Sequence, residues 1–177
     1  DYCVPAYYVL TMAEASSNLS RFDGVRYGRR VSSEDLSDTY IKSRSEGFSE
    51  EVKRRIMTGT YVLSSGYYDA YYSKALKVRR VIKNEYNKLF LKVDCLFIPT
   101  TATIAFPLKN HLDDPIKMYL ADIFTVPFNL IGTPSLNIPA GTTKDKLPIG
   151  FQIAGNSFKE ETLFNFAHSL NKAELFK

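Results

Sequence analysis

LADIFTVPFNLIGTPSLNIPAGTTKDKLPIGFQIAG, residues 120–155, has the densest turn-forming chemistry in the chain. Four prolines and four glycines divide it around two short apolar runs, residues 135–140 and 149–154. Proline fixes φ and lacks an amide proton, and glycine tolerates positive φ, so one helix cannot run through this stretch. We expect a helix that ends near Asn129, followed by two strands joined by a polar hairpin over residues 142–147. Such a unit can line a pocket, although a buried hairpin beside a helix fits the same pattern.

Helical patterns dominate the rest of the chain. One further apolar run, residues 94–100 (DCLFIPT), predicts a strand buried on both faces. Ser33 and Ser49 each precede acidic residues, so each is expected to cap a helix. Helices are predicted over residues 6–20, 34–44, 50–63, 67–92 and 159–171, with another that opens at Asp114-Pro115. Many helices with few strands predict an α/β fold, in which a mixed sheet flanked by helices is incomplete within these residues.

Composition and charge describe a globular chain. Of its 177 residues, 45% are hydrophobic and 24% are charged, with a net charge of +4, and no apolar run approaches the ~20 residues that span a bilayer. Cys3 and Cys95 match no metal-binding or redox spacing, and His111 and His168 are the only histidines. We therefore expect a reducing compartment, no zinc site and no histidine-based triad within these residues. Because the chain begins at Asp1 without a leader, we also expect a fragment of a longer protein.

Two features could serve RNA binding, and each also has a structural interpretation. The tyrosines of residues 67–72 have i, i+3 and i+4 spacing, which is more typical of a buried stripe than of a surface on which bases stack. Basic residues cluster within residues 21–30, 53–55 and 77–83. Such clusters face phosphates in some proteins and form solvated helix faces balanced by acids in others.

Arg55 belongs to the basic run of residues 53–55 but is distinguished by its position. In a helix that buries Ile56 and Gly59, Arg55 lies nearest the buried face. An unpaired buried guanidinium is costly, so its partner is either a protein carboxylate or an anionic substrate. Asp122 is an acid on an apolar segment, so its carboxylate is either paired in the core or exposed to a pocket.

Three parts of the sequence carry a resemblance to a known family. They are AEASSNLSRFDGVRYG (residues 13–28), SRSEGFSEEVKRRIMTGTYVLSSGYYDAYY (residues 43–72), and VPFNLIGTPSLNIPAG (residues 126–141) with LPIGFQIAG (residues 147–155). Together they resemble the C-terminal part of the A subunits of glutamyl-tRNA(Gln) amidotransferases, a group within the amidase signature family. Many amidases share the last part, whereas the first two are more particular to these subunits. The resemblance covers essentially the whole chain and implies that residues 1–177 are the C-terminal part of a single amidase domain.

The resemblance also implies an activity. In such enzymes a serine, activated by a second serine and a lysine, releases ammonia from glutamine. A partner B subunit uses ATP and Mg²⁺ to activate glutamate on tRNA(Gln), and a small C subunit clamps A to B. The location implied is the bacterial cytoplasm or an organelle of bacterial descent. The Gly/Ser-rich signature and the lysine segment of the family do not occur in these residues. We therefore expect no catalytic residue, no bound cofactor and no activity from these residues alone.

A glutamine-binding wall of Tyr7, Arg55 and Asp122 is a further implication of the resemblance. Arg55 offers a planar fork to the substrate carboxylate, Asp122 an anion to its ammonium group, and Tyr7 a wall that ends in a hydroxyl. Two other interpretations fit the same residues. A general amidase of the same family, acting on small amides, would not need Arg55 together with Asp122. A non-catalytic scaffold would use the basic clusters to dock RNA, with a steep salt dependence.

Overall fold

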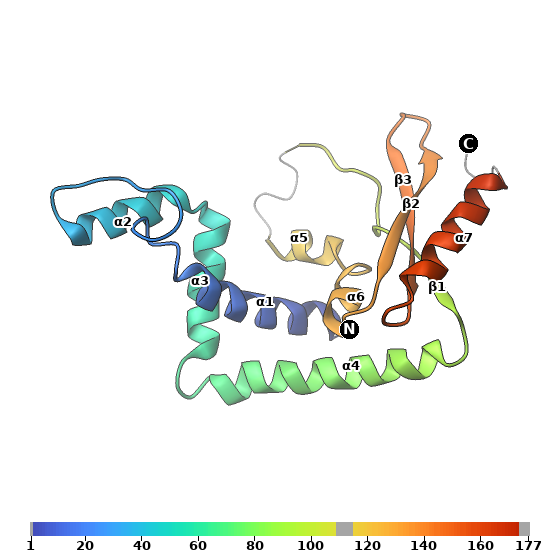
Figure 1. The fold of residues 1–177 in the computed structure, drawn as a ribbon, viewed down its shortest axis with the longest axis horizontal. Coiled ribbons are helices and arrows are strands. Elements are labelled where there is room, and N and C mark those ends of the chain that lie inside the picture. Colours follow the sequence, from blue (N-terminus) through green and yellow to red (C-terminus); the bar gives the residue numbers. More distant parts are fainter. Residues whose placement is uncertain (1, 109–114, 174–177) are drawn as a thin grey trace. The chain divides into compact units, whose positions relative to one another are not determined.

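The computed structural model describes residues 2–108 and 115–173 (Figure 1). The chain divides into two compact units. Pro5–Lys77 contains helices and is called the helical unit, whereas Val78–Lys177, with Asp1–Val4, contains the strands and is called the sheet unit. His111 and the predicted cap Asp114 lie outside the described residues. In the part of the chain that is described, no helix has both the length and the apolar character needed to cross a bilayer.

The helical unit is built on close contact between two helices. Its elements are α1 (Cys3–Leu19), α2 (Leu36–Gly47), α3 (Glu50–Leu63) and the π-helical segment η1 (Tyr68–Ser73). A Cβ added to Gly59 of α3 would lie 1.9 Å from the carbonyl oxygen of Met12 in α1. Only glycine allows two backbones to approach this closely. The helices predicted for this part of the chain are thus present, and Gly59 sets the distance between two of them.

The cap of α2 is Asp35 rather than the predicted Ser33. The Asp35 carboxylate accepts a hydrogen bond from the backbone N–H of Asp38 at 3.0 Å, whereas the Ser33 N–H donates to Thr39 Oγ1 at 3.1 Å. Asp and Ser cap equally well, so the cap is the residue at which the chain leaves the extended conformation. Ser49 precedes α3 as predicted, although its side chain makes no capping hydrogen bond with any described residue.

The sheet unit contains three antiparallel strands in the order β1-β3-β2. Its strands are β1 (Cys95–Pro99), β2 (Ser135–Thr142) and β3 (Pro148–Gly155). Ile153 of the central strand lies opposite Phe97 on one side and Leu136 on the other. The α/β class and the hairpin of β2 and β3 are therefore confirmed.

Helices cover both faces of this sheet. On one face, Leu163 of α7 (Glu160–Lys172) packs against Phe151 and Ile153. The opposite face is covered by α4 (Lys74–Phe90) and α6 (Val126–Ile131). Three side chains of these helices surround Ala154 there: Phe90, Phe128 and Ile131. Because successive strand residues point to opposite faces, β3 contributes alternate side chains to the two cores.

The prediction that the strand of residues 94–100 is buried on both faces is wrong. β1 is an edge strand, and Phe97 is 59% exposed although its ring stacks on Phe151 with the ring centroids 4.1 Å apart. An apolar run is typical of a strand covered on both sides, but one aromatic pair on an open edge produces the same run.

The helix expected to end near Asn129 consists of two helices. α5 (Pro115–Ala121) and α6 are separated by a turn over residues 122–125. Pro127 lies in the first turn of α6, where its missing N–H costs nothing, but it would break a helix that continued from α5. α6 ends before Gly132, whose φ of 69° provides a left-handed C-cap.

The tyrosines of residues 67–72 do not form the predicted buried stripe. Tyr67, Tyr68 and Tyr71 are each more than two-fifths exposed. The i, i+4 pairs Tyr67–Tyr71 and Tyr68–Tyr72 do keep ring contact, with centroids 6.1 and 5.1 Å apart, so the spacing correctly indicates neighbours but not burial. Tyr67 and Tyr71 gather instead around Tyr61 of α3, with ring centroids 4.3 and 6.2 Å from that ring.

Candidate substrate-binding site

Arg55 has a protein carboxylate beside it and is partly exposed. Its Nε–H donates to Glu51 Oε1 at 2.9 Å, and its guanidinium carbon lies 5.7 Å from the centre of the Tyr8 ring. The Arg55 side chain is nevertheless 37% exposed. Glu51 also accepts a hydrogen bond from Arg54 Nη1 at 2.7 Å. Glu51 therefore pairs with both guanidinium groups.

Tyr8, which the sequence analysis did not single out, supplies the ring beside Arg55. Tyr8 is 8% exposed, and Tyr7 packs edge-on against it with ring centroids 5.2 Å apart. Tyr8 lies one turn before Met12 on α1, just as Arg55 lies one turn before Gly59 on α3. Sequence reasoning missed Tyr8 because the pairing of two distant helices is not visible in either helix alone. A role for Tyr7 stays a prediction.

Asp122 lies in the sheet unit, at the turn between α5 and α6. Its carbonyl oxygen accepts hydrogen bonds from the backbone N–H groups of Thr125 and Val126, both at 3.0 Å, and from Thr125 Oγ1 at 3.1 Å. These bonds start α6. The Asp122 residue is exposed, so it does not lie in the core. Tyr7 and Arg55 belong to the helical unit, so the three predicted contacts come from two units.

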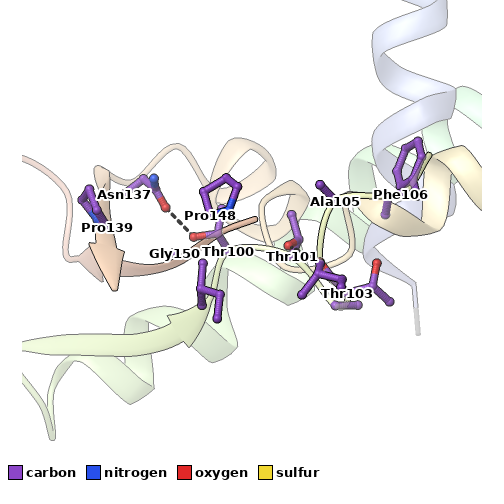
Figure 2. Close-up of a pocket in the computed structure, with 13 residues that line it drawn as sticks. Thr100, Thr101, Thr103, Ala105, Phe106, Asn137, Pro139, Pro148 and Gly150 are labelled. Atoms are coloured by element: carbon purple, nitrogen blue, oxygen red, sulfur yellow. Dashed lines mark hydrogen bonds between the residues drawn. The ribbon is translucent and has the colours of Figure 1, made fainter. Parts of the chain in front are cut away.

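A pocket of about 360 Å³ lies in the sheet unit, beside the end of β1 and the hairpin end of β2 and β3. It is lined by residues 100–106 and Ala121, with Asn137, Pro139, Pro148, Ile149 and Gly150. Figure 2 shows the hydrogen bond that the Thr100 hydroxyl donates to Asn137 Oδ1. None of these lining side chains is charged, and hydroxyl and amide groups are interspersed with apolar ones. Such a lining suits a neutral polar group better than an ion.

Gly150 leaves room for the polar pair in this pocket. A Cβ at that position would lie 3.1 Å from Asn137 Oδ1 and 3.3 Å from Thr100 Oγ1. Of the two interpretations of the hairpin, the pattern alone favours an ordinary buried hairpin, whereas in the structure Asn137 and Gly150 both line a pocket. Residues 100–106 were missed because a loop without periodicity gives no sequence signal. The lining reaches Ala121, so the pocket extends to the residue before Asp122.

Gln152 is a buried polar residue that sequence reasoning also missed. It is 3% exposed and lies on the central strand β3. Its Nε2 donates to the carbonyl oxygens of Phe124 at 2.8 Å and Pro99 at 3.4 Å, and its Oε1 accepts from Ser135 Oγ at 2.8 Å. The only signal was a single amide inside an apolar run, which does not identify the partners.

Acids pair with the basic cluster of residues 53–55 and with one residue of the cluster of residues 21–30. Ion pairs join Arg29 to Glu46, Lys53 to Glu50 and Arg54 to Glu51. Arg79 donates from Nε to the Leu130 carbonyl oxygen at 2.6 Å, at the end of α6. This pairing favours solvated helix faces over a phosphate-binding surface.

Neither a metal centre nor a reactive thiol is indicated. In residues 2–108 and 115–173, no group of three or more His, Cys, Asp or Glu side chains could hold a metal ion. Cys3 and Cys95 are free, and burial raises the pKa of both thiols above its ordinary value. Both side chains are therefore thiols rather than thiolates at neutral pH.

Comparisons with known proteins agree on one family. The Amidase family model matches residues 1–164. A glutamyl-tRNA(Gln) amidotransferase A subunit of Clostridium acetobutylicum is 56% identical over 174 residues, which are 98% of this chain and 36% of the relative. The corresponding protein of Pelagibacter ubique is 52% identical over 177 residues, 100% of this chain and 36% of the relative. The chain thus spans about a third of the length of the curated relatives that it matches.

Solved structures show the same relationship. The crystal structure of the glutamyl-tRNA(Gln) amidotransferase A subunit from Thermotoga maritima is 40% identical with a TM-score of 0.67, and the match covers 97% of this chain and 32% of that one. A crystal structure described as an amidase is 22% identical with a TM-score of 0.70, covering 99% of this chain and 36% of that one. At that identity the second match shows the fold alone.

Proposed function

The chain belongs to the amidase family, and we propose that it is the glutamine-recognising part of the A subunit of a glutamyl-tRNA(Gln) amidotransferase. The observation that carries this proposal is the identity of 52–56% to such subunits over nearly the whole chain. We further propose that both units form the C-terminal part of a single amidase domain.

In this proposal Arg55 and Asp122 recognise the two charged groups of free glutamine. Arg55 binds the α-carboxylate, which is supported by the partial exposure of its guanidinium beside the Tyr8 ring. Asp122 binds the α-ammonium group, which is supported by its exposed position beside the pocket. Tyr7 is the third residue of this proposed amino-acid site, where it supplies a wall that ends in a hydroxyl.

The chemical step belongs to residues outside this sequence. We propose that a serine nucleophile, a second serine and a lysine of the complete A subunit hydrolyse the glutamine amide. The ammonia then reaches a B subunit, which uses ATP and Mg²⁺ to activate glutamate on tRNA(Gln), and a small C subunit holds A and B together. The carboxylate clamp is what this chain contributes. It makes the reaction specific for a free amino acid rather than for any small amide.

The test compares glutamine hydrolysis by the full-length chain with its partner subunits and by its Arg55→Ala and Asp122→Ala variants. Each substitution leaves one charge of the bound substrate without its counter-ion. We expect a loss of about 2–5 kcal/mol in glutamine binding, read as a higher KM. Hydrolysis of a simple neutral amide is expected to continue in both variants, because that substrate has no charge to bind.

Arg54→Ala is the matched control for this experiment. Arg54 is the neighbouring guanidinium on the same carboxylate but is 51% exposed, so its loss is expected to leave the KM for glutamine nearly unchanged. Equal activity of wild type and both variants on glutamine and on the neutral amide would contradict the proposal. That result would favour a general amidase instead.

A further inference from the structure

Gln152 is an amide in the most apolar part of the sheet unit. It is 3% exposed on the central strand, and its neighbours Ile153 and Ala154 are fully buried. Burying an amide disfavours folding unless its donors and its acceptor are hydrogen-bonded. The partners of this amide therefore indicate what the position does.

Those partners come from three separate segments. Oε1 accepts from Ser135 Oγ at 2.8 Å, and Nε2 donates to Phe124 O at 2.8 Å and to Pro99 O at 3.4 Å. Both donors and the acceptor of the carboxamide are thus in use. The shorter donor bond ends two residues after Asp122, in the turn of residues 122–125. The longer one ends on the residue before the pocket loop. One side chain thereby attaches both the turn and the loop to β3.

We propose that Gln152 is a positioning residue, which holds the turn of residues 122–125 so that the Asp122 carboxylate meets the ammonium group of glutamine. The inference rests on the proposed function, because it takes Asp122 as the ammonium ligand. Bonds within the turn, from Thr125 and Val126 to the Asp122 carbonyl, fix its shape but not its place on the sheet. The bond from Gln152 joins the turn itself to the sheet, in addition to the packing of Phe128 and Ile131 of α6 on Ala154. Small displacements of a recognition group cost a large factor in rate.

The test measures discrimination between two substrates of the full-length chain with its partner subunits. L-glutamine carries the α-ammonium group, whereas glutaramate has the same carboxylate and amide but no ammonium group. The ratio of kcat/KM for the two substrates therefore reports the contribution of Asp122. Gln152→Met keeps the size of the side chain and removes both N–H donors. We expect it to lower the ratio about 10-fold through the KM for glutamine, and to change glutaramate hydrolysis by less than about 3-fold.

Gln152→Glu supplies a second readout that a merely structural role would not move. The protonated carboxyl group keeps one donor for Phe124 O, and ionisation removes it. Burial raises the pKa of a carboxyl group, so the discrimination ratio is expected to fall as the pH rises through a range above the usual one for glutamate. Ser135→Ala is the matched control. It removes the bond on the acceptor side and leaves both N–H donors, so its ratio is expected to match wild type at every pH.

Each result decides between the two claims. Loss of discrimination in Asp122→Asn and in both Gln152 variants supports the positioning role. If discrimination is lost in Asp122→Asn but kept in the Gln152 variants, the role of Gln152 alone is overturned. The same conclusion follows if a Gln152 variant loses activity equally on both substrates, or if the ratio in Gln152→Glu does not change with pH. Discrimination kept in Asp122→Asn overturns the ammonium-binding role of Asp122, and the positioning role with it. If Gln152→Met does not fold, the pH series of Gln152→Glu decides alone.

Discussion

Tyr61 is a residue whose ionisation is shifted by its neighbours. A side-chain hydrogen bond with Tyr67, followed by desolvation and the nearby Tyr71, raises the pKa of Tyr61 from 10.0 to about 12. The folded state therefore favours the neutral phenol. Its contribution to stability is fully present below pH 10.0 and is lost as the pH rises toward about 12. The difference in tyrosinate absorbance between wild type and Tyr61→Phe isolates the ionisation of Tyr61. We expect this difference to rise near pH 12 rather than near pH 10.0.

Tyr67→Phe tests the cause of this shift. It removes the hydroxyl that pairs with Tyr61 and leaves the ring, whose centroid lies 4.3 Å from that of Tyr61. In this variant the ionisation of Tyr61 is measured as the difference in absorbance from the variant that carries both Tyr61→Phe and Tyr67→Phe. We expect the pKa of Tyr61 to move back toward 10.0. If the pKa of Tyr61 is already near 10.0 in the wild-type protein, that result would contradict the arrangement of these rings.

Some residue-level features could be predicted from the sequence and others could not. The helical position of Arg55 predicts an anionic partner, either a protein carboxylate or a substrate, and Glu51, one turn earlier, is such a carboxylate. Tyr8 and Gln152 could not be predicted. Tyr8 depends on how α1 packs on α3, and Gln152 on which loops meet β3. Both depend on contacts between segments far apart in the chain, which local periodicity does not encode.

At the scale of elements, Gly59 controls the contact of α1 with α3. The Cβ of an alanine would lie 1.9 Å from Met12 O and 2.8 Å from Ser16 Cβ, so the two helices would have to separate. We expect Gly59→Ala to lower the free energy of unfolding by at least about 3 kcal/mol, measured by denaturant unfolding of the full-length chain. Because Arg55 lies one turn away on α3, the KM for glutamine is also expected to rise.

Gly47→Ala provides the control for this prediction. Gly47 ends α2, and a Cβ there would meet no described atom within 4 Å. Replacing a helical glycine by alanine is expected to raise the free energy of unfolding by up to about 1 kcal/mol. Similar unfolding curves for the two alanine variants would show that the helix contact does not depend on Gly59.

The sequence pattern predicts elements well where one signal dominates. The hairpin of β2 and β3 follows from two apolar runs separated by a polar turn, and α7 from its amphipathic period. Prediction fails where signals compete. Asp35 and Ser33 are equally good caps. Pro127 is compatible with the first turn of a new helix and incompatible with the continuation of an earlier one. In each case a tertiary contact or a local backbone choice decides.

At the scale of the whole molecule, the sheet formed by the described residues has open edges. β1 and β2 are both edge strands, and Phe97 on β1 is 59% exposed. An exposed apolar edge invites pairing with further strands. The curated relatives are about three times as long as this chain, since it covers 36% of each. We therefore expect the remainder of a full-length protein to extend the sheet and to provide the nucleophile.

The proposal that glutamine recognition and the chemical step lie in different parts of the full-length protein leads to a prediction about activity. A polypeptide of these 177 residues contains Arg55, Asp122 and the pocket, but no Gly/Ser-rich signature from which a serine could attack an amide. Recognition groups without a nucleophile and a base hold a substrate without lowering the barrier of the chemical step. We expect the isolated polypeptide, once circular dichroism shows its helices to be formed, to release no ammonia from glutamine. The full-length chain with its partner subunits is expected to release it, and Arg55→Ala is expected to reduce that release. Ammonia production by the isolated polypeptide at a rate comparable to the full-length enzyme would place the catalytic groups within these residues and would refute the division.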